Sequence, residues 1–282
     1  IGSVVIEVAA GVFADESVDV AGVADVVVGN AVGQEHHDFV GVVATKAALT
    51  VGLDVVPGGN QAGLGGRRRT LVSHGLQRVS KSGIRSARVS ILETNASAKG
   101  LLSHRTFNFI RHFFEMRLDI NSVRLPTARQ GAPNSRRLKR GEENLLTEIQ
   151  NRCFTDAWGF NPNTEEEIAY RLNMHGRSPD DVILTYLGDL PVGYCWTIIN
   201  AKENEKREKS KGLIHMLGVD PHYRQQEIGR AVLLNGLEDL NARGVDTVEL
   251  TVDNENPAAC SLYESVGFEV YAKTEWYERI VT

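Results

Sequence analysis

The stretch from Leu213 to Leu234 restricts the possible folds more than any other part of this sequence. It begins with an apolar run, Leu213–Val219, which is typical of a buried β-strand. Pro221 then ends the strand, and a short polar loop leads to Gly229 and an amphipathic helix. This order brings free backbone N–H groups and the positive end of a helix dipole to one place. We therefore expect the turn to bind an anionic group such as a phosphate.

A second motif follows the first along the chain. It has the pattern N-x-x-A-x-x-L-Y-x-x-x-G-F and runs from Asn256 to Phe268. The first motif has the pattern V-x-P-x-x-R-x-x-x-x-G and runs from Val219 to Gly229. In this order and spacing, the two motifs resemble the conserved segments of the GNAT superfamily of acyl-CoA N-acyltransferases. The resemblance implies an N-acetyltransferase that uses acetyl-CoA as its co-substrate and a primary amine of a small molecule or peptide as acceptor.

The composition is that of an ordinary globular protein. The chain has 282 residues, of which 42% are hydrophobic and 24% charged, and its formal net charge is -5. A negative chain lacks the broad basic face that phosphate backbones require, so we expect no nucleic-acid partner. No apolar run is long enough to cross a bilayer, so no membrane association is expected.

The cysteines argue against a metal or disulfide framework. Cys153, Cys195 and Cys260 are odd in number and widely spaced, with no Cys-x-x-Cys pair. We therefore expect no metal cofactor and a reducing, cytoplasmic location. A monomer or a homodimer is the expected assembly.

Parts of the second half have counterparts in the first half. Residues 55–65 align with 219–229, with Pro57 on Pro221 and Gly65 on Gly229. Residues 95–107 align with 256–268, so that Asn95 falls on Asn256. Two motifs in the same order indicate a tandem duplication, with chance matching of short patterns as the alternative.

The duplication predicts three segments. The first, 1–120, is a degenerate GNAT-like domain that is expected to be N-terminally truncated, because the chain begins at Ile1. The second, 121–134, is rich in Pro, Gly and polar residues and is predicted to be a linker. The third, 135–282, is the predicted catalytic domain. Its runs predict the order β-α-α-β-β-β-α-β-α-β, which is the order implied by the resemblance. The fold class is therefore α/β (α+β), with two tandem GNAT-like domains, each a mixed central sheet flanked by helices.

The resemblance assigns the acetyl-CoA contacts to both motifs. The predicted contacts are Leu217, Val219, Arg224, Gln225, Gln226, Glu227, Ile228, Gly229, Arg230, Asn256 and Ala259. Glu227 departs from the family pattern, which has glycine there. A carboxylate would crowd and repel a pyrophosphate unless it turned outward to solvent.

Tyr263 is the predicted general acid, because the family's tyrosine at this place protonates the leaving thiolate. The alternative is a half-buried aromatic residue that packs under the sheet. The first copy has Leu102 at the matching place, and leucine cannot donate a proton. Only the second copy is therefore expected to be catalytic.

The general base is less clear from the sequence. A tandem subgroup of the family has a glutamate base where this chain has Leu213. His215 lies two residues further on the same strand face and could replace it, since imidazole titrates near neutral pH. A strand histidine that binds a backbone carbonyl is the equal alternative. Glu249 and Asp253 are the next acids to consider.

Trp158 and Phe160 are predicted to cover the acceptor, because this region shapes the substrate pocket in GNAT domains; plain core packing is the alternative. A second class of function also remains open. The Glu227 and Leu213 departures would suit a non-catalytic acyl-CoA-binding or regulatory module.

Overall fold

The computed structural model describes residues 27–28, 38–44, 48–55, 86–123, 133–174, 176–199, 204 and 209–280. Its described residues fall into two compact units. The N-terminal unit comprises Ile1–Phe114, Asp253–Glu255 and Ala272–Thr282, and the C-terminal unit comprises Glu115–Val252 and Asn256–Tyr271. The first copy's phosphate-loop counterpart, at 57–65, lies outside the described residues. The domain bounds 1–120, 121–134 and 135–282 stay a prediction.

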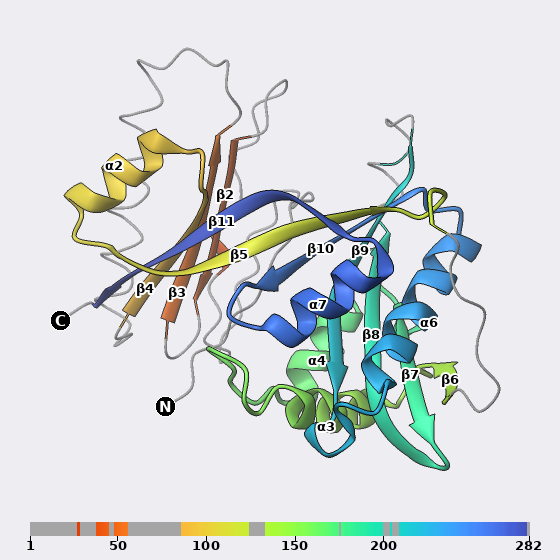
Figure 1. The fold of residues 1–282 in the computed structure, drawn as a ribbon. Coiled ribbons are helices and arrows are strands. Elements are labelled where there is room, and N and C mark those ends of the chain that lie inside the picture. The colour runs from red at the N-terminus through yellow and green to blue at the C-terminus, as the bar shows by residue number, and fades with distance from the viewer. Residues whose placement is uncertain are drawn as a thin grey trace. The chain divides into compact units, whose positions relative to one another are not determined.

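In the N-terminal unit, the strand order is β1-β2-β3-β4-β11-β5. Its strands are β1 (Val27–Val28), β2 (Asp38–Ala44), β3 (Ala48–Val55), β4 (Ser86–Leu92), β5 (Asn108–Asp119) and β11 (Glu269–Ile280), and its described helix is α2 (Ala96–His104) (Figure 1). β3 and β4 pair in parallel, and β4 pairs antiparallel with β11 from Thr274 to Ile280. β5 and β11 each begin in one unit and end in the other.

In the C-terminal unit, the strand order is β5-β10-β9-β8-β7-β6. Its further strands are β6 (Asn134–Arg137), β7 (Val182–Leu187), β8 (Leu190–Ile199), β9 (Lys211–Val219) and β10 (Thr247–Asp253). Its helices are α3 (Glu143–Cys153), α4 (Glu165–Leu172), α6 (Ile228–Ala242) and α7 (Pro257–Val266), with short 3-10 turns η1 (Pro179–Asp181) and η2 (Pro221–Tyr223). The predicted element order is confirmed, because each predicted helix and strand of this half is present.

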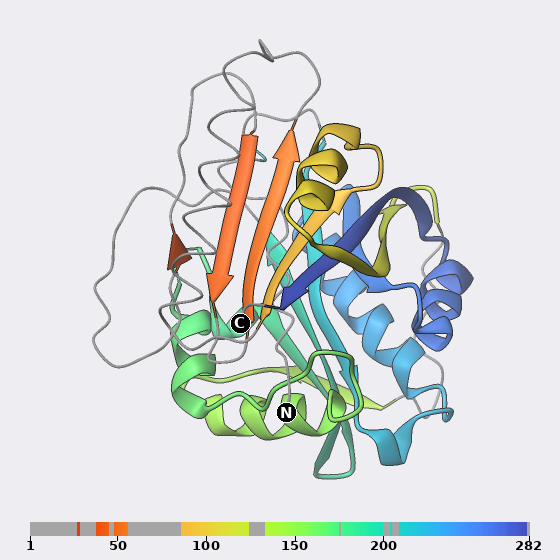
Figure 2. The same ribbon diagram turned by 90° about the vertical axis from the view of Figure 1, so that its left-hand side faces the viewer.

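Helices cover both faces of the C-terminal unit's sheet, with α3 and α4 on one side and α6 on the other (Figure 2). α6 lies close to the strands because Gly193 and Gly212 have no side chains to separate them. A Cβ on Gly193 would lie 2.8 Å from Val232 Cγ2, and one on Gly212 would lie 2.9 Å from Leu240 Cδ2.

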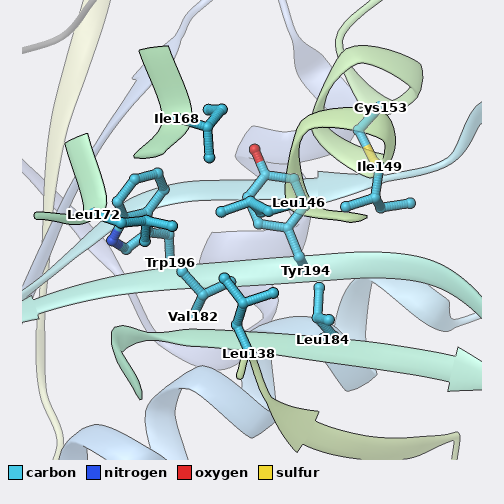
Figure 3. Packing of buried hydrophobic residues seen from close by; sticks show 10 residues of the cluster. All are labelled: Leu138, Leu146, Ile149, Cys153, Ile168, Leu172, Val182, Leu184, Tyr194 and Trp196. Carbon is cyan, nitrogen blue, oxygen red and sulfur yellow. The ribbon is translucent and has the colours of Figure 1, made fainter. Parts of the chain in front are cut away.

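The core on the other face is formed by side chains of α3, α4, β7 and β8, with Leu138 after β6. Figure 3 shows these residues, which are Leu138, Leu146, Ile149, Cys153, Ile168, Leu172, Val182, Leu184, Tyr194 and Trp196. Tyr194 and Trp196 are the largest of them and are almost fully buried. Gly218 of β9 lets α3 approach, since a Cβ there would lie 2.7 Å from Cys153 Cβ.

Two neighbouring polar residues have different roles at the start of α4. Thr164 is the N-cap, and it forms a capping box with Glu167. The backbone N–H of Asn163 instead donates to the side chain of Asn151 at 2.9 Å. Asn163 therefore ties the loop before α4 to α3.

The second repeated motif has the same local structure in both halves. Asn95 caps α2 by accepting from the N–H of Ala98, and Asn256 caps α7 by accepting from the N–H of Ala259. After each helix, the N–H of a phenylalanine donates at 3.1 Å to the carbonyl of the residue five positions before it, Leu102 in the first copy and Tyr263 in the second. The shared geometry supports the duplication and confirms that Leu102 matches Tyr263.

Candidate active site

The site begins where two parallel strands of the C-terminal unit separate. β9 pairs with β8 along its length as far as Val219, but it pairs with β10 only from Lys211 to Leu213. The last pair of that parallel ladder joins Leu213 to Glu249. In this described part of the sheet, the β10-side edge of β9 beyond Leu213 is therefore without a strand partner. Its N–H and C=O groups are suited to an extended ligand that carries amides.

The loop that follows β9 leads directly into α6. Asp220 ends the strand and accepts from the N–H of His222 at 3.1 Å, which starts the turn. Glu227 is the N-cap of α6, and within this described loop its side chain makes no capping hydrogen bond. The N–H groups in the first turn of the 15-residue helix therefore remain available to an anion.

Two residues of this loop adopt a left-handed backbone. Gln225 has φ 60° and Glu227 has φ 62°, a region that side chains rarely occupy. The backbone at position 227 is thus one that favours glycine, which explains the family pattern physically. Both side chains are exposed, as is that of Gln226, whereas Ile228 is buried under the loop. Glu227 is therefore exposed to solvent, while its charge remains at the N-terminus of α6.

The arginines hold the loop to α3. Arg224 donates to the carbonyl of Cys153 at 2.7 Å, at the C-terminal end of α3, and lies 3.6 Å from the Asp156 carboxylate. Arg152 donates to Asp220 at 2.8 Å and to the carbonyl of Pro191 at 3.2 Å. The sequence analysis missed the Arg152–Asp220 pair. The position of Asp220 before a proline marks it as a turn cap, but it does not indicate the arginine partner. The predicted phosphate contact of Arg224 stays a prediction, and its present contacts clamp the loop.

The beginning of α6 packs against α7. A Cβ on Gly229 would lie 3.4 Å from Leu262 Cδ2 and 3.8 Å from Val219 Cγ2, which is ordinary contact. Arg230 donates to the hydroxyl of Ser265 at 3.0 Å. The residues of both motifs that are predicted to contact acetyl-CoA therefore belong to adjacent elements of one unit.

Tyr263 lies on α7 and is 7% exposed. Its ring packs edge-on against Phe268, with centroids 5.8 Å apart. Asn256, exposed, and Ala259, half-buried, form the first turn of the same helix. Leu217 and Val219 are half-buried on β9, opposite Cys195 and Gly193 of β8.

His215 lies at an irregularity in the ladder. Trp196 pairs with Met216 and Thr197 with Ile214, so His215 is the extra residue of β9. Its ring stands edge-on to that of Trp196 at 5.4 Å. Burial, and then the positive charges of Arg177 and Arg171, lower the pKa of His215 to about 3. The imidazole is therefore neutral at physiological pH, and its role as a base stays a prediction.

The other acids that the sequence offered are paired. Glu249 is 7% exposed and binds both Arg117 and Lys211 within the C-terminal unit. Asp253 binds Arg111 at 2.5 Å within the N-terminal unit. Both acids are thus held in ion pairs on their own units.

The aromatic residues of the α3–α4 loop are half-buried. Phe160 lies 6.3 Å from Phe154, which lies 6.5 Å from Tyr194 of the core. Phe160 is thus anchored on the core, while the role of Trp158 and Phe160 toward an acceptor stays a prediction.

None of the described helices is both long and apolar enough to span a membrane.

Comparison with known proteins agrees with this arrangement. Residues 144–268 match the sequence profile of the Acetyltransferase (GNAT) family. The fold is shared with a GCN5-related N-acetyltransferase from Sphaerobacter thermophilus (21% identity, TM-score 0.68, 86% of this chain and 76% of the other). A tandem GNAT protein from the clavulanic acid biosynthesis pathway also shares it (14% identity, TM-score 0.62, 86% and 78%). The predicted fold class is confirmed.

The sequence relatives are more specific. A mycothiol acetyltransferase from Thermobispora bispora is 35% identical over 140 residues, which are 50% of this chain and 47% of the relative. One from Rhodococcus erythropolis is 26% identical over 178 residues, 60% of this chain and 58% of the relative. The chain therefore spans about half the length of the curated relatives that it matches.

Proposed function

We propose that the C-terminal unit transfers an acetyl group from acetyl-CoA to a primary amine of a small molecule or peptide. The observation that carries this proposal is the separation of β9 from β10 beside the N-terminus of α6. An unpaired strand edge and an uncapped helix N-terminus next to each other suit a ligand with both amides and a pyrophosphate, which is the chemistry of CoA.

The pyrophosphate binds the N–H groups of the first turn of α6, near Ile228–Arg230. The helix dipole and these donors favour an anion there, by about 0.3–2 kcal/mol for the dipole alone. The amide-bearing arm of CoA runs along β9 between Leu217 and Val219 and forms the hydrogen bonds that β10 does not supply. The thioester then lies beside the separated strands.

The reaction is a direct transfer. The amine nitrogen attacks the thioester carbonyl carbon and forms a C–N bond, and the carbonyl oxygen becomes an oxyanion. The intermediate collapses, the C–S bond breaks, and the thiolate takes a proton from the hydroxyl of Tyr263. Such positioned proton transfer contributes about 10²–10⁴-fold to the rate. The amide product has lost one amine proton, which passes to water or returns to the tyrosine.

His215 assists by accepting a hydrogen bond, and its imidazole does not take up the proton. With a pKa of about 3, its imidazole stays neutral and presents a lone pair throughout the physiological range. The amine must therefore enter in its free-base form. The relatives are named mycothiol acetyltransferases. Because this chain has Leu213 in place of a glutamate base, we propose for it only the broader acceptor class of primary amines.

The test is Tyr263→Phe in an assay of CoA thiol release with a panel of amines. The ring packing against Phe268 is kept, so we expect a kcat at least 100-fold lower, with near-normal affinity for acetyl-CoA and little change in Tm. Tyr170→Phe is the control, because Tyr170 is 60% exposed on α4. Full activity of Tyr263→Phe would overturn the assignment of the acid. CoA binding without thiol release for any amine would favour a non-catalytic acyl-CoA-binding module.

A further inference from the structure

Three potential metal ligands meet in the N-terminal unit, far from one another in sequence. Glu93 follows β4, His112 lies on β5, and Glu275 lies on β11. One ligand atom from each of the three lies within 4.8 Å of those of the other two. Among the described residues, no other group of at least three such side chains comes together in this way.

His112 has a nitrogen without a partner. Its Nδ1 is buried and has no hydrogen-bond partner among the described residues. The ring packs against Phe109, with centroids 4.6 Å apart, which restricts its orientation. A buried imidazole nitrogen without a partner is costly, and a metal ion is one way to satisfy it.

The carboxylates at this place already attract a cation. Glu275 is 7% exposed, accepts from the hydroxyl of Tyr277 at 2.7 Å and binds the ammonium of Lys99 at 2.9 Å. Lys99 pairs with the Glu275 carboxylate, and Glu93 adds a second carboxylate to the cluster.

We propose that Glu93, His112 and Glu275 bind one Zn²⁺ ion, with Lys99 displaced to solvent. The Lys99 side chain is 34% exposed at the surface of α2 and is free to rotate outward, and Glu93 is exposed and can turn inward. Ligand atoms around a tetrahedral Zn²⁺ lie about 3.4 Å apart, so rotation of Glu93 closes the remaining distance. Water completes the coordination.

The donor set selects the metal. Imidazole nitrogen with two carboxylates suits Zn²⁺ and disfavours Mg²⁺ and Ca²⁺, which prefer oxygen ligands only. Among divalent first-row ions, Zn²⁺ exceeds Mn²⁺ and Fe²⁺ in affinity, and a three-ligand tetrahedral site suits it better than Cu²⁺. The ion would link β5, β11 and the turn after β4, and so fasten the last strand of the chain to strands from its first half.

The experiment is Zn²⁺ titration of the chelator-treated full chain by calorimetry, with Tm measured in parallel. We expect one equivalent of saturable binding and a Tm rise of about 5 °C at 100-fold excess over Kd. Loss of a residue that only orients a metal ligand typically costs 10–100-fold in metal affinity. Glu93 and His112 are proposed as direct ligands, so Glu93→Gln and His112→Ala should each weaken Zn²⁺ binding at least tenfold.

Lys99→Met gives the sharpest readout, because it removes the competing ammonium and should tighten Zn²⁺ binding. Glu269→Gln on β11 and His104→Ala on α2, both at exposed positions, serve as controls and should bind as the parent protein does. Equal affinity in Glu93→Gln and His112→Ala, no change in Lys99→Met, or no saturable binding would each overturn the proposal. Acetyl transfer by the C-terminal unit is not needed for any of these outcomes.

Discussion

Glu227 offers a direct test of the proposal that this loop binds CoA. The residue has φ 62°, is exposed, and is the N-cap of α6. A left-handed backbone costs a residue with a side chain about 1–2 kcal/mol, which Glu227→Gly would relieve. Against this stand about 0.5–1 kcal/mol of glycine entropy and about 0.3–1 kcal/mol for a lost carboxylate at a helix N-terminus. Stability should therefore change by no more than about 1 kcal/mol, or a few degrees in Tm.

The affinity for CoA should change more than the stability. At about 6 Å in water, a carboxylate and one phosphate charge repel each other by about 0.7 kcal/mol, and the pyrophosphate has two such charges. Removal of Glu227 should thus lower the Kd of CoA about tenfold at low salt. Screening in 0.15 M salt, with a Debye length of about 8 Å, reduces the gain to about threefold.

Calorimetry with CoA at 10 and 150 mM salt measures both values. Glu227→Gln keeps the side chain and removes only the charge, so its gain over the parent gives the electrostatic part. The further gain of Glu227→Gly over Glu227→Gln gives the effect of side-chain crowding. Gln225→Gly is the matched control, because Gln225 has φ 60° without a charge. The reasoning is refuted if Glu227→Gln binds CoA no more tightly than the parent at 10 mM salt.

Three other predictions concern the pH dependence of stability, Gly229 in the loop before α6, and the contact between Arg152 and Asp220. Because the pKa of His215 falls from 6.5 to about 3 on folding, the unfolded state binds a proton first as the pH drops, and stability should fall by about 2 kcal/mol between pH 7 and 5. His215→Gln should flatten this slope in urea unfolding, and an unchanged slope would show that the imidazole is not the cause. Gly229→Ala places a Cβ 3.4 Å from Leu262, so the fold should persist while the Kd of CoA rises roughly tenfold, as measured by calorimetry; unchanged affinity would place the pyrophosphate elsewhere. Burial raises the pKa of Asp220, but hydrogen bonds from Arg152 and His222 hold it below its usual value. Asp220→Asn should cost about 1.5–3 kcal/mol at pH 7, and the difference from the parent should shrink below about pH 4 as the parent's carboxyl is protonated; a difference that persists at low pH would contradict a charge-assisted clamp.

The sequence was sufficient to predict the elements of the C-terminal unit. Each element is marked by local features: alternating or continuous apolar runs for β7 to β10, and caps such as Asn256 for the helices. These signals depend on residues that are close together in the sequence, so they can be recognised without knowing the tertiary structure. At the start of α4, either Asn163 or Thr164 could cap the helix, and the contact of Asn163 with Asn151 leaves Thr164 as the cap.

The sequence also indicated which turn could bind an anion and which residue of each repeat occupies the predicted catalytic position. The match of Tyr263 with Leu102 needed only a register, and the shared hydrogen bonds from Phe268 and Phe107 bear that register out. The backbone geometry of such a motif depends on residues that are close together in the sequence. It can therefore be predicted from one sequence alone.

Long-range contacts and the local dielectric were decided only by the tertiary structure. The separation of β9 from β10 after Leu213 depends on strands joined through α6, and no sequence period announces it. The pKa of His215 depends on its burial and on Arg171 and Arg177, which lie on other elements. Glu93, His112 and Glu275 come together because β4, β5 and β11 belong to one unit of the sheet. Such groupings arise from packing between distant segments, because the energy that places them comes from contacts the local sequence does not contain.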